Sequence, residues 1–291
     1  MTLTEMKNCA AETLSYFMQV MLDVPFTEND IIIEFANKKD MAKQAKILCE
    51  KYVPDKKIND SQATQLNSTI AANALIGREK SAVIVCINYN NDKQDWRKIF
   101  FHEFMHIYCA KLEIDGEHFI DIYGSGHTPD ENPENVLYDG IINAGYDVWS
   151  EFIAQYFTLK KVERAYTFNE AADFILDLLG DATTKYFIES KGIFAQACAY
   201  LLACFDIEKV LFDIKNAPDY LITDSEPYSK ETKASLLSCL DFLKEQLKQE
   251  YPWKISEDFI ESFGSKFNTF RMMNSLYMGD INTESFTSKF L

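Results

Sequence analysis

The spacing of apolar and polar residues in the first half of the chain alternates between a helical and a strand-like period. Apolar residues that recur every three or four positions predict helices at 4–23, 38–52 and 61–76. Two short runs rich in β-branched residues predict strands at 30–36 and 81–89. Because only two strands are predicted, we expect a small sheet.

The second half has an almost purely helical pattern from residue 167 onward. Its clearest stretch has leucines at i, i+4, i+7 and i+11 and ends at Tyr251-Pro252. These leucines are Leu236, Leu240, Leu243 and Leu247. A hairpin is predicted at 112–123, and a loop rich in Gly, Pro, Asp and Asn at 124–135.

These elements predict an α+β, predominantly helical fold with two parts. The expected division is a mixed α/β core at 1–165 and an all-helical subdomain at 166–291. We expect a cleft between the two parts, with a functional site on its floor.

One further predicted helix, at 96–112, carries the sequence His102-Glu103-Phe104-Met105-His106. Asp95 is its predicted N-cap, and neither Gly nor Pro interrupts it. Two His at i and i+4 project from one face of a helix, close enough to bind one metal ion. Glu103, slightly off that face, can take a proton from a metal-bound water. The helix is apolar on its other sides, so we expect it to be buried.

A catalytic zinc site needs a third protein ligand and leaves its fourth position to water. The candidates are Glu151, His118, His127, Asp121 and Asp139. Glu151 is favoured because it is the only acidic residue in the middle of a predicted buried helix at 147–160, with no basic residue within a turn. Asp147 is the predicted cap of that helix. Eleven residues separate His118 from His106, whereas the metzincin pattern has five.

The pair of motifs, His102-Glu103-x-x-His106 followed by a helix with Glu151, resembles the gluzincin metallopeptidases. More narrowly, the chain is similar to their small cytosolic ImmA/IrrE-like members. The resemblance covers 81–161 and implies a zincin-like active-site core in which two His and a later Glu hold one zinc ion. It also implies that the strand at 81–89 borders the cleft and binds an extended peptide by pairing with it.

The chain departs from the thermolysin-type pattern at one position. Those enzymes have an Asp four residues after the ligand Glu, where this chain has Gln155. The Gln155 amide oxygen can accept the same hydrogen bond from a ligand His. Asp147, one turn on the other side of Glu151, is an alternative partner.

The mechanism also needs a hydrogen-bond donor for the oxyanion that forms during hydrolysis. Five residues are candidates, and we select Tyr146 because it is close in sequence to Glu151. The full set is Tyr138, Tyr146, Tyr156, His118 and His127. Glu103 is the predicted general base.

Composition and charge limit the partners and the compartment. The chain is 47% hydrophobic with a formal net charge of −16, which disfavours binding to nucleic acid or anionic membranes. No signal peptide and no apolar run of membrane-spanning length is evident. Seven Cys without a CxxC pair indicate reduced thiols in the cytoplasm. A nucleophilic Cys109 beside His106 is a remote alternative.

We therefore expect a cytoplasmic zinc metallopeptidase that hydrolyses peptide or protein substrates. The alternative is a catalytically silent protein that keeps the zincin scaffold as a metal-binding or regulatory interaction module. Glu103 favours the enzyme, because a purely structural metal site has no need of a base beside an open ligand position. A third hypothesis, a metal-free helical structural protein, predicts that no zinc is bound.

Overall fold

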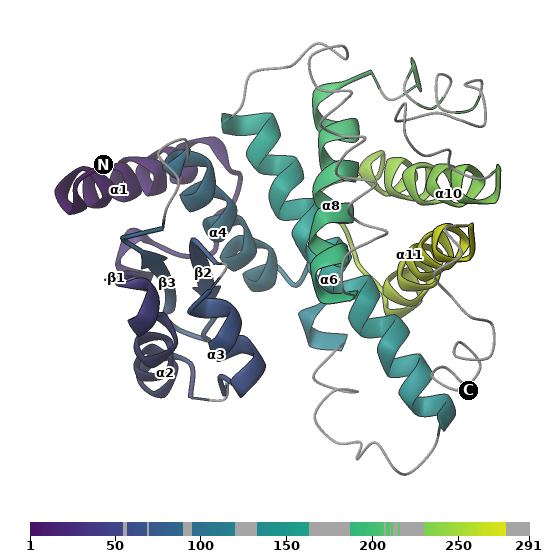
Figure 1. The fold of residues 1–291 in the computed structure, drawn as a ribbon. Coiled ribbons are helices and arrows are strands. Elements are labelled where there is room, and N and C mark those ends of the chain that lie inside the picture. The colour runs from purple at the N-terminus through teal and green to yellow at the C-terminus, as the bar shows by residue number, and fades with distance from the viewer. Residues whose placement is uncertain are drawn as a thin grey trace. The chain divides into compact units, whose positions relative to one another are not determined.

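A computed structural model describes residues 1–54, 57–68, 70–89, 95–119, 133–162, 187–206, 208–209, 211, 215 and 230–277 (Figure 1). The chain divides into two compact units. Unit 1 comprises 1–112 with 161–163, and unit 2 comprises 113–160 with 164–291. The described part is α+β and mostly helical, as predicted, whereas the domain boundary at residue 165 stays a prediction.

Unit 1 is built on a three-stranded sheet, one strand more than predicted. The strands are β1 (Ile31–Ala36), β2 (Ala72–Leu75) and β3 (Ser81–Cys86), in the order β1-β3-β2. β1 runs parallel to β3, and β2 runs antiparallel to it.

The predicted helix at 61–76 is wrong in its second part. Helix α3 (Asp60–Leu66) is only seven residues long, and β2 follows it. Ala and Leu favour helices, but tertiary pairing overrides this weak preference: Ala74 pairs with Val83 and Leu75 with Ala82.

Strand β3 lies in the centre of the sheet, and all six of its residues are buried. Both of its edges already pair with other strands. A central strand has no unpaired edge to offer to an incoming peptide. The expectation that this strand binds an extended peptide by pairing with it is therefore wrong.

Helices cover the two faces of the sheet (Figure 1). On one face, alternate residues of β3 pack against helix α2 (Met41–Tyr52). This helix confirms the prediction at 38–52, except that Lys38–Asp40 form a 3₁₀ turn before it begins. Helices α1 (Leu3–Val20) and α4 (Trp96–Lys111) lie at the other face.

Helix α1 holds α4 in place through aromatic packing. Phe17 of α1 is fully buried, and its ring contacts the rings of Phe101, Phe104 and Tyr108 on α4. The Tyr108 hydroxyl also donates a 2.8 Å hydrogen bond to the carbonyl of Leu22, which lies 86 residues earlier. These contacts fix the position of α4 relative to α1.

The described part of unit 2 is helical, as predicted for the second half of the chain. Its long helices are α6 (Pro133–Val162, whose last two residues count with unit 1), α8 (Phe187–Cys204), α10 (Lys230–Leu247) and α11 (Glu257–Tyr277). Leu236, Leu240 and Leu243 are buried on α10, as their spacing predicts. Within the described residues, no helix has the length and apolarity needed to cross a membrane.

Two predictions for the start of unit 2 are wrong. The predicted hairpin at 112–123 has no strand within its described part, 112–119, where Gly116 (φ 88°) turns the chain into a single helical turn. The last residues of the predicted loop, 133–135, belong to α6, and 120–132 lie outside the described residues.

Unit 2 carries the whole net charge of the chain. It contains 14 of the 29 basic residues and 30 of the 45 acidic residues, whereas the two kinds are equal in unit 1. The acidity that the whole sequence suggests is therefore a property of unit 2 alone.

Candidate metal centre

Helix α4 begins where the sequence predicts. The Asp95 side chain accepts hydrogen bonds from the backbone N–H groups of Arg97 and Lys98, which confirms Asp95 as the N-cap. The apolar side chains of α4 are fully buried at Phe100, Phe101, Phe104, Ile107 and Tyr108. The helix is therefore an interior helix, as its composition indicates.

His102 and His106 converge on one point beside this helix. Their Nε2 atoms lie 3.0 Å apart, and their ring planes are nearly perpendicular, at 84°. Two nitrogens bound to one tetrahedral zinc ion at about 2.0–2.1 Å would lie about 3.3 Å from one another. The two imidazoles thus have nearly the separation that a shared metal ion requires.

Glu151 of α6 completes a group of three ligands. One ligand atom from each of His102, His106 and Glu151 lies within 4.8 Å of the other two, and all three side chains are partly buried. Among the described residues, this is the group of His, Cys, Asp and Glu side chains that could hold a metal ion. Two imidazoles and a carboxylate can bind a divalent metal and leave a position open for water.

Glu103 follows His102 directly on α4, and it is only 8% exposed. It does not belong to the group of three ligands. Burial shields its carboxylate from bulk water, which suits a general base better than an exposed position would.

Of the other predicted ligands, His118 is the one whose side chain the structure describes, and it does not join this group. His118 lies in the helical turn at 117–119; its Nδ1 is buried and makes no hydrogen bond to the described residues. His127 and Asp121 lie outside the described residues, as does the side chain of Asp139.

Two of the three tyrosines that are candidate oxyanion donors can be compared. Burial holds the pKa of Tyr146 well above its ordinary value, and the carboxylates of Asp115, Glu117, Asp147 and Glu151 raise it further. Its phenol therefore keeps the proton that a hydrogen-bond donor needs. Burial also raises the pKa of Tyr156, but this ring stacks on Phe152 and serves packing. The side chain of Tyr138 lies outside the described residues.

Asp147 is not a helix cap, because α6 runs without interruption from Pro133 to Val162. Instead its carboxylate accepts a hydrogen bond from the ammonium of Lys191 on α8. Partial burial raises the pKa of Asp147, and Lys191 opposes this effect. Sequence reasoning missed Lys191, which is 44 residues away; its one signal is a cation within a strongly apolar helix.

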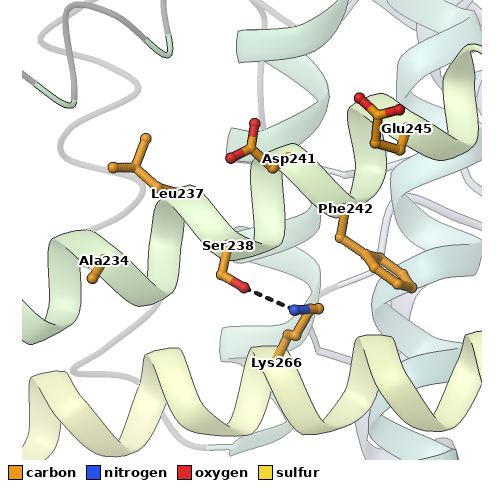
Figure 2. Close-up of a pocket in the computed structure, with 7 residues that line it drawn as sticks. All are labelled: Ala234, Leu237, Ser238, Asp241, Phe242, Glu245 and Lys266. Carbon is orange, nitrogen blue, oxygen red and sulfur yellow. Dashed lines mark hydrogen bonds between the residues drawn. The ribbon is translucent and has the colours of Figure 1, made fainter.

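A separate hollow of about 550 Å³ lies beside α10 and α11 (Figure 2). Lys266 donates a 2.8 Å hydrogen bond to the hydroxyl of Ser238, and its ammonium lies 5.6 Å from the centre of the Phe242 ring. Asp241 and Glu245 also line this hollow. None of these side chains belongs to the metal-ligand group, so the chemistry of this hollow is separate from that of the metal centre.

Comparison of the chain with family models, with curated proteins and with solved structures finds no match. The functional argument therefore depends on the residues themselves.

Proposed function

We propose that this chain is a cytoplasmic, zinc-dependent metallopeptidase with a gluzincin-like, zincin-type core. The observation that carries the proposal is the convergence of the His102 and His106 Nε2 atoms, 3.0 Å apart, with a Glu151 carboxylate oxygen. Glu103, buried on the same helix, adds a base that simple metal storage would not need.

Zinc is the metal that best matches these ligands. Two imidazoles and one carboxylate form a standard catalytic zinc set, whereas Mg²⁺ and Ca²⁺ prefer oxygen ligands alone. A bound zinc ion would lower the pKa of a water molecule at its open position to about 7.

The other catalytic roles belong to residues of the chain. Glu103 takes a proton from the attacking water and delivers it to the amine that leaves. Tyr146, whose raised pKa keeps the phenol protonated, donates a hydrogen bond to the developing oxyanion. His102, His106 and Glu151 hold the metal.

Elemental analysis of the purified protein is the first test. About one zinc per chain is expected in the wild type and a loss of zinc in Glu151→Ala, because a ligand is gone. His118→Ala is the matched control, since His118 is also partly buried but lies outside the ligand group. A wild type that binds no zinc even when zinc is offered would overturn the proposal.

The second test separates the enzyme from a silent metal-binding protein. Glu103→Gln should retain zinc but lose peptide hydrolysis, because the amide cannot act as a base. The peptide library should include basic sequences, since unit 2 carries the whole net negative charge. A wild type that holds zinc but cleaves none of the library, with Glu103→Gln indistinguishable from it, would favour the regulatory alternative.

A further inference from the structure

Lys191 of unit 2 is a buried cation that the sequence did not predict. It is only 8% exposed, and its ammonium bonds the carboxylate of Asp147. A buried ammonium is costly unless it is paired, so Lys191 requires a carboxylate within reach. In the structure, Asp147 meets that requirement.

Glu151 lies one helical turn beyond Asp147 on α6. Side chains at i and i+4 are neighbours on one face of a helix, with Cβ atoms about 6 Å apart. The negative charge of Glu151 also helps to raise the pKa of Asp147. Glu151 is thus the next carboxylate along this face for a flexible lysine side chain.

We propose that Asp147 is a positioning residue that keeps Lys191 engaged, so that the Glu151 carboxylate stays available to the metal. This inference rests on the proposed metal centre and adds to it a role for two residues that are not ligands. Without the Asp147 carboxylate, Lys191 pairs with Glu151 instead and withdraws the third ligand. Without Lys191 as well, this ammonium no longer competes with the metal for Glu151, and binding recovers.

The test is a set of four proteins: wild type, Asp147→Asn, Lys191→Met and the double variant. The dissociation constant for zinc is measured by competition with a chromophoric chelator at fixed pH and salt. Asp147→Asn should bind zinc about ten- to a hundredfold more weakly. Lys191→Met and the double variant should bind zinc within about threefold of wild type, or more tightly. Asp147→Glu, which keeps a carboxylate for Lys191, should restore most of the affinity.

This pattern separates positioning from a structural role. If the Asp147–Lys191 pair only stabilises the fold, its loss in either single variant would lower the melting temperature of the metal-free protein. The zinc affinities of the two single variants would then both fall, or both stay unchanged. Either result overturns the inference and leaves the proposed function standing. If Asp147→Asn does not fold, Lys191→Met decides, because weaker zinc binding in that variant contradicts the inference. A wild type without zinc would overturn the metal centre itself.

Discussion

Gly145 of α6 and Gly264 of α11 face each other where the two helices cross. A Cβ added at Gly145 would lie 2.0 Å from the carbonyl oxygen of Ile260, and one added at Gly264 would lie 2.1 Å from that of Ile141. No side chain fits between backbones at this distance. The close crossing brings α11 against α6 six residues before Glu151.

We expect Gly145→Ala to destabilise the protein by about 2–4 kcal/mol, because the helices must separate to admit one methyl group. The melting temperature should fall by roughly 5–10 °C. Gly140→Ala is the matched control on the same helix: Gly140 is exposed, and no atom of the described part of the chain lies within 4 Å of its added Cβ. That variant should gain up to about 1 kcal/mol from helix propensity. Equal effects of the two substitutions would contradict the close crossing.

Removal of the metal should lower the melting temperature of the wild type. A ligand that binds only the folded state at a thousand times its dissociation constant stabilises it by about 4 kcal/mol. Calorimetry with and without a chelator measures this difference. The chelator should have no effect on His102→Ala, whereas His118→Ala should respond as the wild type does.

Tyr146→Phe tests the proposed role of Tyr146 as oxyanion donor. Loss of one such donor typically lowers kcat about a hundred- to a thousandfold, and we expect this with the zinc content unchanged. Tyr156→Phe is the control, because Tyr156 is a partly buried tyrosine of the same helix that stacks on Phe152. A Tyr146→Phe variant with full activity would transfer the role to another candidate.

We expect two buried cysteines, Cys198 and Cys239, to make the protein less stable at alkaline pH. Burial raises the pKa of Cys239 to about 12 and that of Cys198 well above its ordinary value. An unfolded thiol ionises near pH 8.5, so above that pH the unfolded state gains stability that the folded state does not. The free energy of unfolding should therefore fall as pH rises from about 9 towards 12. Below about pH 9 these two thiols should contribute no pH dependence.

Urea unfolding at several pH values measures this slope. Replacing both residues by Ala should make the slope shallower by about 1.4 kcal/mol per pH unit for each thiol. The comparison with the wild type cancels the contributions of lysines and tyrosines that titrate in the same range. An unchanged slope would mean that these thiols ionise in the folded protein.

Helix α4, which carries His102 and His106, was predictable because its signals are local. The Asp95 cap, the spacing of His102 and His106 and the apolar cover all lie within one stretch of about seventeen residues, and the structure confirms the cap, the convergence and the burial. Glu151 was predictable in part for the same reason, since it is the acidic residue in the middle of an apolar helix.

The errors arose where distant residues decide the structure. Ala72–Leu75 has no strand-like pattern of its own and becomes a strand only because β3 pairs with it. Asp147 has the side chain of a typical cap, but α6 continues through it, and its carboxylate pairs with Lys191, 44 residues later. No local signal distinguishes a cap from the partner of a remote cation.

The packing of α1 against α4 also has a consequence for the order of events during synthesis. Phe17 leaves the ribosome well before Phe101 and Tyr108, and the Tyr108 hydroxyl bonds a carbonyl 86 residues earlier. Because protein synthesis proceeds at about 5–20 residues per second, the apolar face of α1 stays uncovered for on the order of 4–20 seconds until α4 is made. The nascent N-terminal helix therefore carries an uncovered aromatic side chain, and a chaperone that binds such surfaces would have several seconds in which to act.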